Sequence, residues 1–242
     1  MDAGALAGKL SDWIKDKVTT AGCKGAVLGM SGGIDSSVVA ALCIKAFPEN
    51  TLGLIMPCHS NEKDKEHAEI MAKQFSIPTR TVVLDDIYDE YLKILPEFKP
   101  EKALVQLARA NLKARLRMIT LYYTANQLKY LVIGSGNRSE LTVGYFTKHG
   151  DSGVDILPLG NLVKKEVREL ARFLKIPPGI IDKAPSAGLW AGQTDEAEMG
   201  ITYEALDNYI LTGKAPEEVK KRIERMRAAS VHKCTTAPIP EF

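Results

Sequence analysis

Residues 26–37 read Ala-Val-Leu-Gly-Met-Ser-Gly-Gly-Ile-Asp-Ser-Ser. The apolar run 26–30 is typical of a buried strand, and the small residues after the turn suit the start of a helix. Between strand and helix, two glycines let the backbone approach an anion closely, and the hydroxyls of Ser31, Ser36 and Ser37 add donors. This unit predicts a parallel sheet with a pyrophosphate-sized anion site where its first core strand ends.

The rest of the chain alternates strand-like and helix-like segments. We therefore predict an α/β fold with a doubly wound, mostly parallel sheet and helices on both faces. The expected strands are 26–30, 52–56, 80–84 and 130–133, and the expected helices are 6–17, 37–46, 62–75, 88–95, 102–127, 161–177, 202–211 and 216–229. Residues 184–196 fit neither pattern, so we expect a mobile loop there.

Two of the expected helices carry an apolar stripe. In the first helix, Leu6, Leu10, Trp13 and Ile14 lie on one side, so we expect that helix to cover a surface of the fold. The long helix 102–127 has a stripe that we expect to be buried. The residues of that stripe are Leu104, Leu107, Ala108, Leu112, Leu116, Ile119 and Tyr123.

Composition limits the kind of protein. A chain of 242 residues that is 45% hydrophobic can bury one substantial core, so we expect a single domain over residues 1–242. The chain has 32 Lys and Arg against 30 Asp and Glu, a balance that gives no general attraction for nucleic acid or for an anionic membrane. We see no apolar stretch typical of a signal peptide or a membrane span, and we expect a cytoplasmic protein. The four cysteines form no Cys-x-x-Cys pair, which argues against disulfides and zinc.

The turn at residues 29–37 differs from the phosphate loop of kinases. That loop reads Gly-x-x-x-x-Gly-Lys-Ser/Thr, and the missing lysine disfavours transfer of the γ-phosphoryl group. The Ser-Gly-Gly-Ile-Asp-Ser run of residues 31–36 resembles the loop of the ATP pyrophosphatase superfamily, whose fold is adenine nucleotide α-hydrolase-like. Its members split ATP between the α and β phosphates to adenylate a substrate. The alternative is a helix cap with turn glycines and no ligand.

A second cluster of polar residues, 134–140, reads Gly-Ser-Gly-Asn-Arg-Ser-Glu and follows the strand 130–133. In a parallel sheet it would reach the same carboxyl edge as the first turn, so the two loops would enclose a cleft. Asp35 and Glu140 would then supply hard oxygen ligands suited to magnesium. The alternative is that both carboxylates are solvated surface groups.

Further segments make the resemblance more specific. Gly-Tyr-Phe-Thr-Lys at 144–148, Gly-Asp at 150–151, Asp155 and Pro-Leu at 158–159 follow the second cluster in order. Together with residues 111–118, 183–187, 195–196, 200–203 and 232–233, they resemble the ammonia-dependent NAD synthetases over nearly the whole chain.

The resemblance implies ATP as co-substrate, Mg²⁺ as cofactor, and deamido-NAD (nicotinic acid adenine dinucleotide) and ammonia as the other substrates. Asp35, Glu140 and Lys164 would be the catalytic residues, with the two carboxylates holding the metal. The ATP site would consist of Gly29, Met30, Ser31, Gly32, Gly33, Ile34, Asp35, Ser36, Ser135, Lys164 and Ser186. The dinucleotide would contact Asn111, Arg115, Lys148, Asp155, His232 and Lys233, across the interface of a homodimer.

The chain departs from the family pattern at three positions. Ser135 stands where many relatives have Thr, and it keeps the hydroxyl. Gly188 and Cys234 replace what is often Asp and Arg, respectively. The last two changes concern contacts of the loop and the tail rather than the reaction itself.

Other functions remain open from the sequence. One is a different adenylating enzyme of the superfamily, an amidotransferase or a tRNA thiolase, although a thiolase should show paired cysteines or a basic face. Another is a nucleotide-binding regulatory module without turnover. We expect no glutaminase domain, because helix-forming sequence begins almost at the start and no nucleophilic Cys segment precedes it. Free ammonia is then the nitrogen source, and a separate glutaminase partner remains an alternative.

Overall fold

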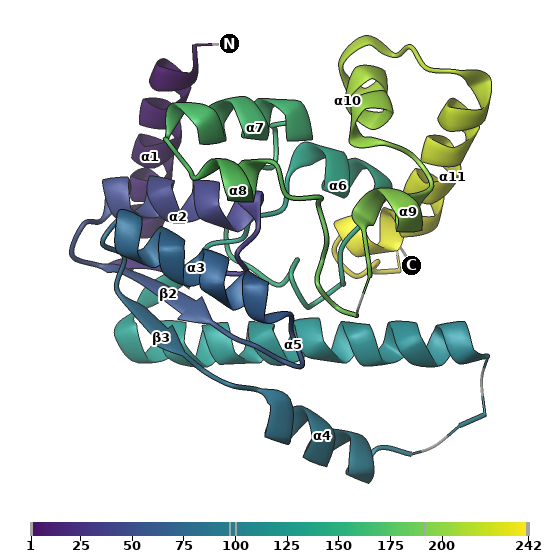
Figure 1. The fold of residues 1–242 in the computed structure, drawn as a ribbon, viewed down its shortest axis with the longest axis horizontal. Coiled ribbons are helices and arrows are strands. Elements are labelled where there is room, and N and C mark those ends of the chain that lie inside the picture. Colours follow the sequence, from purple (N-terminus) through teal and green to yellow (C-terminus); the bar gives the residue numbers. More distant parts are fainter. Residues whose placement is uncertain (1, 97, 100, 191, 241–242) are drawn as a thin grey trace.

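The structure is a computed structural model, and it describes residues 2–96, 98–99, 101–190 and 192–240 (Figure 1). Its centre is a four-stranded sheet in the order β3-β2-β1-β4, in which every neighbouring pair is parallel. The strands are β1 (Gly25–Gly29), β2 (Thr51–Ile55), β3 (Thr79–Thr81) and β4 (Tyr130–Val132). The predicted α/β fold is confirmed. Because the strand order reverses between β1 and β4, the first predicted turn and the second polar cluster lie at a topological switch point.

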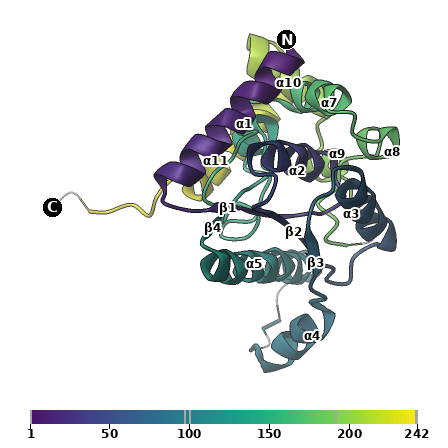
Figure 2. The same ribbon diagram turned by 90° about the vertical axis from the view of Figure 1, so that its left-hand side faces the viewer.

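Helices cover both faces of the sheet (Figure 2). On one face lie α1 (Ala3–Thr20), α2 (Ile34–Ala46), α3 (Glu62–Gln74) and α7 (Lys164–Phe173), and on the other lie α5 (Lys102–Leu128) and, outside it, α4 (Asp85–Ile94). Strand β1 is buried from Gly25 to Leu28 because both of its faces are covered. Its continuous apolar sequence follows from this double burial.

The remaining helices gather near the carboxyl edge of the sheet. They are α6 (Arg138–Val143), α8 (Pro178–Ile181), α9 (Asp195–Met199), α10 (Tyr203–Thr212) and α11 (Glu217–Cys234). Val143, Met199, Leu206 and Ile223 form a small apolar core that joins α6, α9, α10 and α11. This core holds the second polar cluster against the end of the chain. None of the described helices combines the length and the apolarity needed to cross a bilayer.

Several predicted boundaries need correction. The helix expected from residue 161 begins at Lys164, and the strand expected at 80–84 ends at Thr81. Three short helices, α6, α8 and α9, were not predicted, because segments of four to six residues carry too little periodicity. The stretch expected to be irregular, 184–196, has no regular structure until α9 begins at Asp195, and residue 191 within it lies outside the described residues.

The prediction of the buried stripe on the long helix was wrong. Within the chain, α5 instead buries Ala110, Ala114, Leu121 and Ala125. Small side chains on this face let the helix approach the sheet closely. Much of the expected stripe is exposed: Leu104, Leu107, Ile119 and Tyr123 have exposed fractions of 56%, 47%, 58% and 67%.

Candidate functional site

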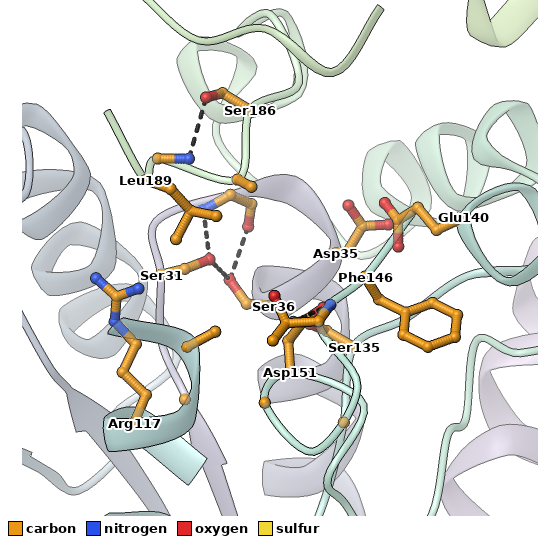
Figure 3. Close-up of a pocket in the computed structure, with 18 of the residues that line it drawn as sticks. Ser31, Asp35, Ser36, Arg117, Ser135, Glu140, Phe146, Asp151, Ser186 and Leu189 are labelled. Atoms are coloured by element: carbon orange, nitrogen blue, oxygen red, sulfur yellow. Dashed lines mark hydrogen bonds between the residues drawn. The ribbon is translucent and has the colours of Figure 1, made fainter. Parts of the chain in front are cut away.

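A cavity of about 640 Å³ opens at the carboxyl ends of β1 and β4. Its walls come from the turn before α2, the start of α6, the middle of α5, the start of α7 and residues 183–190 (Figure 3). It brings together every predicted site residue except Gly32 and Asp155. The predicted residues that line it are Gly29, Met30, Ser31, Gly33, Ile34, Asp35, Ser36, Asn111, Arg115, Ser135, Glu140, Lys148, Lys164, Ser186, His232 and Lys233.

The turn between β1 and α2 is held by its own hydroxyls. The Ser31 and Ser36 hydroxyls lie 2.9 Å apart, and the Ser36 hydroxyl donates to the Gly33 carbonyl at 3.0 Å (Figure 3). The Ser37 hydroxyl donates to the same carbonyl at 2.8 Å. Gly33 is the N-cap of α2 and has no side chain to satisfy the first N–H groups of the helix. Those N–H groups are directed toward the cavity end of the helix, where an anion is favoured.

Gly32 lies on the side of this turn that packs against α3. Its φ is +73°, and a Cβ at this position would overlap the backbone carbonyl oxygen of Asp64 in α3. The residue therefore does not line the cavity, yet it lets the turn pack directly on the next helix. No larger residue fits without moving one of the two segments.

A Gly32→Ala variant is expected to lose about 1–3 kcal/mol of stability and to bind nucleotide more weakly, because it adds backbone strain to a steric overlap. Gly22→Ala is the matched control. Gly22 has a similar φ of +68°, but no heavy atom lies within 4 Å of the position that a Cβ would take. An alanine there therefore adds backbone strain without a steric overlap. Chemical unfolding and nucleotide titration should separate the two variants; equal effects would show that the contact with Asp64 is unimportant.

Lys164, Asp35 and Glu140 form a buried charge cluster. The Lys164 Nζ lies 2.5 Å from Asp35 Oδ2 and 3.2 Å from Glu140 Oε1, and the lysine side chain is 2% exposed. Asn137 donates from Nδ2 to Asp35 Oδ1 at 2.9 Å and also caps α6, where its backbone N–H donates to Glu140 Oε2 at 3.2 Å. The Tyr203 hydroxyl lies 3.3 Å from Glu140 Oε1 and 3.0 Å from Asp195 Oδ2, and its one hydrogen can be donated to either carboxylate.

The cluster contains two carboxylates for one ammonium group. In this buried arrangement the pKa values of both Glu140 and Lys164 are raised. Burial raises the pKa of Glu140 to about 7, with Asp35 adding to the shift and Lys164 opposing it. For Lys164, burial lowers the pKa, but the carboxylates of Asp35 and Glu140 outweigh burial and raise it above the usual range. Lys164 therefore stays charged, and Glu140 is the group that changes protonation near neutral pH.

Protonation of Glu140 is expected to stabilise the folded protein at mildly acidic pH. The folded pKa of about 7 exceeds the ordinary value of 4.5, so the stabilisation is fully present below pH 4.5 and is lost as the pH rises through about 7. The free energy of unfolding should fall between about pH 5 and about pH 8 more in the parent than in Glu140→Gln, which cannot ionise there. Parallel urea titrations would measure this; identical pH slopes would contradict it.

Asp35 and Glu140 fit a magnesium ion by their chemistry. They already hold one cation, the Lys164 ammonium, between hard carboxylate oxygens. Within the ranges that the structure describes, no group of three or more Asp, Glu, His or Cys side chains forms a complete metal site. Two carboxylates suit Mg²⁺, which in nucleotide sites takes most of its remaining ligands from phosphate and water.

At another part of the cavity wall, four predicted dinucleotide residues hold the 144–150 loop against α5 and α11. Arg115 donates from Nε and Nη2 to the Lys148 carbonyl at 3.3 Å, and Lys148 Nζ donates to the His232 carbonyl at 2.6 Å. Lys233 Nζ donates to the carbonyls of Gly144 and Phe146 at 2.9 and 3.0 Å. Nearby, Asn111 Oδ1 accepts a 2.6 Å hydrogen bond from the hydroxyl of the loop's Thr147. This part of the wall forms a rim that carries the basic side chains of Lys148 and Lys233, and the centre of the Phe146 ring lies 5.5 Å from Lys233 Nζ.

Asp155 lies outside the cavity wall. Its Oδ1 accepts from the Tyr122 hydroxyl at 3.0 Å, and its Oδ2 accepts from the Val132 backbone N–H at 2.8 Å. Within one chain these contacts hold the end of β4.

The positions that depart from the family pattern have simple surroundings. Gly188 adopts φ +62°, and a Cβ there would lie 3.2 Å from Asp64 Oδ2. Asp64 is also paired with Lys183, so the carboxylate beside Gly188 already has a cationic partner. Cys234 is exposed, with its Sγ 3.8 Å from the Leu141 carbonyl.

Three residues that the structure places at the charge cluster were not predicted as site residues: Asn137, Asp195 and Tyr203. The spacing of Asn137 and Glu140 matches a capping box, and this signal could have shown that Asn137 fixes Glu140. Tyr203 lies 63 positions from Glu140, and no local pattern predicts that contact. Its ring also faces Lys164, with the Nζ 4.8 Å from the ring centre.

Comparison with known proteins connects this arrangement to a family. The family model described as NAD synthase matches residues 6–237. The NH(3)-dependent NAD(+) synthetase of Carboxydothermus hydrogenoformans is 51% identical over 232 residues, which cover 96% of this chain and 95% of that protein. The protein of the same name from Syntrophomonas wolfei is 47% identical over 246 residues, 99% of this chain and 96% of that one.

Solved structures agree with the sequence comparison. The NMN synthetase from Francisella tularensis matches with a TM-score of 0.95 and 38% identity, and the NH3-dependent NAD synthetase from Campylobacter jejuni with 0.82 and 30%; each match covers 100% of both chains. The family model spans most of the chain, and the relatives match almost end to end. The chain therefore belongs to the NAD synthase family.

Proposed function

We propose that the protein amidates deamido-NAD with ammonia and ATP, forming NAD, AMP and pyrophosphate through an adenylate intermediate. The observation that carries this proposal is the cluster of Lys164, Asp35 and Glu140 beside the anion-binding turn. It joins a site for the phosphates to carboxylates suited to magnesium, in a member of the NAD synthase family. The relatives that are 42–51% identical carry the name NH(3)-dependent NAD(+) synthetase.

In the proposed reaction the turn at residues 29–36 holds the β and γ phosphates through backbone N–H groups and serine hydroxyls. An oxygen of the pyridine carboxylate attacks the α-phosphorus, and the bond to the bridging oxygen breaks as pyrophosphate leaves. Ammonia then attacks the activated carbonyl carbon, AMP departs with the bonding electron pair, and the nitrogen loses a proton. Ser135 and Ser186 face the same cavity and would contact the nucleotide.

Charge neutralisation would come from Lys164 and from the metal. Lys164 is charged and buried at the end of the turn, where negative charge builds up on the leaving pyrophosphate. Mg²⁺ bound by Asp35 and Glu140 would neutralise phosphate charge and orient the oxygens. Residues 184–190 and Gln193 border the cavity, and closure of the loop expected at 184–196 would keep water from the adenylate.

We further propose a homodimer in which the basic rim contributes to the dinucleotide site. The support is the apolar stripe of α5, where Leu104, Leu107, Ile119 and Tyr123 are about half exposed or more in the single chain. A contiguous apolar face of this kind is typical of an interface. In such a dimer Asn111, Arg115, Lys148, Asp155, His232 and Lys233 would contact the dinucleotide.

We also propose that residues 1–242 form one synthetase domain that works in the cytoplasm with free ammonia. Support comes from the names of the relatives, which specify NH(3) dependence, and from the coverage of 95% and 96% of their length. A glutaminase partner is not required.

A second candidate is amidation of the mononucleotide, with NMN as the product. It is favoured by the Francisella structure, whose TM-score of 0.95 exceeds the 0.82 of the Campylobacter NAD synthetase. The sequence identities favour the dinucleotide, because the Carboxydothermus relative is 51% identical and the Francisella protein 38%. Both candidates use the same chemistry and differ in the length of the carboxylate substrate.

One assay tests the reaction and separates the two substrates. The protein would be incubated with ATP, Mg²⁺ and ammonium, together with either deamido-NAD or nicotinic acid mononucleotide. The proposal predicts equal amounts of AMP and pyrophosphate, and a kcat/KM that is higher for deamido-NAD. A higher kcat/KM for the mononucleotide would select the second candidate, and ADP with phosphate would reject adenylation.

A further inference from the structure

Asp207 is a buried acid outside the cavity, and the reaction above assigns it no role. It lies in the middle of α10 and is 4% exposed. Helix α10 packs against α6, which carries Glu140, and against α7, which begins with Lys164 (Figure 1). Asp207 does not line the cavity. Any effect on the reaction must therefore pass through its contacts with these two helices.

Both carboxylate oxygens of Asp207 accept hydrogen bonds, one from each neighbouring helix. The Ser139 hydroxyl donates to Oδ1 at 2.5 Å, and the backbone N–H of Lys165 donates to Oδ2 at 2.7 Å. The same Ser139 oxygen accepts from the backbone N–H of Lys164 at 3.0 Å, and Ser139 is completely buried. Asp207 thus joins the residue before Glu140 to the first two residues of α7.

The start of α7 depends on these acceptors, because its N-cap residue offers none. Val163 is the N-cap, and its apolar side chain makes no capping hydrogen bond. Free N–H groups at the start of a helix are usually satisfied by the N-cap side chain. Here the N–H of Lys164 is satisfied by Ser139 of α6, and that of Lys165 by Asp207 of α10. Two other helices therefore fix the position of the first turn of α7.

The charge of Asp207 also favours this arrangement. Two lysines begin α7, where the positive end of the helix dipole disfavours cations, and a buried carboxylate beside the first turn offsets this. Burial raises the pKa of Asp207, while its hydrogen bonds and the charge of Lys164 oppose the rise. Lys164 is therefore held between acids at both ends: Asp35 and Glu140 pair with its ammonium group, and Asp207 lies near its backbone.

The ammonium group of Lys164 has little freedom of its own. It lies 2.5 Å from Asp35 Oδ2 and 3.2 Å from Glu140 Oε1, and the lysine side chain is 2% exposed. A side chain packed along its whole length moves with its backbone. A shift of the first turn of α7 would therefore displace the ammonium group by a similar amount, and a misplacement of about 1 Å can slow a reaction about 100-fold.

We propose that Asp207, acting through Ser139, is a positioning residue that fixes Lys164 for the adenylation step. This inference rests on the proposed function, because it takes Lys164 as the group that neutralises the leaving pyrophosphate. Asp207 touches no reacting atom. It holds the backbone of Lys164 against the helix that carries Glu140, and so keeps the ammonium group where negative charge develops.

An Asp207→Asn variant tests this with almost the same shape. An amide cannot accept from both donors, because one of its two terminal groups is itself a donor. We expect kcat, and the deamido-NAD-dependent exchange of labelled pyrophosphate into ATP, to fall on the order of 10- to 100-fold. The KM for ATP should change less than about threefold, since Lys164 acts on charge that builds up in the transition state. Near-UV circular dichroism at the assay temperature would give the folded fraction.

Glu166→Gln is the matched control. Glu166 is also an acid at the start of α7, and its Oε2 accepts from the Val163 N–H at 2.9 Å. The change removes a negative charge from the same end of the helix and keeps an acceptor for that N–H. Its kcat should stay within about twofold of the parent. An equal loss in both variants would assign the effect to the helix dipole, and the inference would be overturned.

A double variant tests whether the effect passes through Lys164. When Lys164→Met is the starting protein, adding Asp207→Asn should slow the residual exchange less than about twofold, because no ammonium group is left to position. A further loss of about 10-fold in this background would show that Asp207 acts by another route, and it would overturn the inference.

The remaining outcomes decide the question as well. An unchanged kcat in folded Asp207→Asn overturns the inference, and so does a higher KM for ATP at unchanged kcat. Should Asp207→Asn fail to fold, Ser139→Ala removes the link and keeps the carboxylate. It is expected to lower kcat several-fold at a similar KM, and no change there would overturn the inference. A parent that exchanges no pyrophosphate with either carboxylate substrate rejects the proposed function itself, whereas an active parent with an equally active Asp207→Asn rejects only the role of Asp207.

Discussion

Replacing Glu140 by Gln is expected to lower the rate of NAD formation on the order of 10³-fold without lowering the stability of the protein. The loss of activity follows from removing one of the two carboxylates proposed to hold magnesium. The change keeps the side chain's size. It also preserves the capping box of α6, because Gln serves at that position as Glu does.

The unchanged stability follows from the charge count of the cluster. With both acids ionised, two carboxylates surround one buried ammonium group, and Asp35 raises the pKa of Glu140. Removing the charge of Glu140 leaves a balanced pair between Lys164 and Asp35. We expect an unfolding free energy equal to or higher than that of the parent at about pH 8, within about 1 kcal/mol.

Steady-state rates and urea unfolding of the same preparation would measure both effects. Glu166→Gln is a suitable control, because Glu166 also accepts a hydrogen bond at the start of a helix, from the Val163 N–H at 2.9 Å, but does not line the cavity. A Glu140→Gln variant that keeps its activity would remove Glu140 from the site. A large loss of stability would make it a structural residue instead.

Replacing Lys164 by Met has the opposite expected effect on stability. It leaves Asp35 and Glu140 facing each other in a buried place without a cation, and breaking a buried pair in this way costs about 3–5 kcal/mol. The ammonium group also contacts the face of Tyr203, and this contact is lost. Activity should fall together with stability.

The neighbouring residue provides the control for this variant. Lys165 is exposed on the same turn of α7, so Lys165→Met should change stability by less than about 0.5 kcal/mol. Unfolding in urea would be followed for both. Added Mg²⁺ should restore part of the stability of Lys164→Met, because another cation can lie between the two carboxylates. Equal stability of the two variants would contradict the role given to the buried cluster.

The sequence predicted the sheet because its strands are short, apolar and separated by helical periodicity. The unit 26–37 placed both the first core strand and the turn, and the turn lies where predicted. The predicted ends of helices and strands were wrong where tertiary contacts determine them. The long helix shows the cause most clearly: it has two apolar stripes, and periodicity cannot tell which one faces the sheet.

The site was predictable where residues adjacent in sequence act together, as in the turn at 31–37 and the cluster at 134–140. What the sequence could not show is the pairing of Lys164 with Asp35, across 129 positions, and the contact of Tyr203 with Glu140. Such contacts arise from the packing of α7 against α2 and of α10 against α6 and α7. Asp195 is the extreme case, since an acid in a loop sequence gives no sign of being buried.

The transfer of oxygen from the carboxylate tests the proposed chemistry most directly. Deamido-NAD labelled with ¹⁸O in its pyridine carboxylate would be turned over with unlabelled ATP, and the products would be examined by mass spectrometry. Attack on the α-phosphorus predicts one ¹⁸O in the phosphate of AMP and none in pyrophosphate. Label in inorganic phosphate, or AMP without label, would contradict adenylation of the carboxylate.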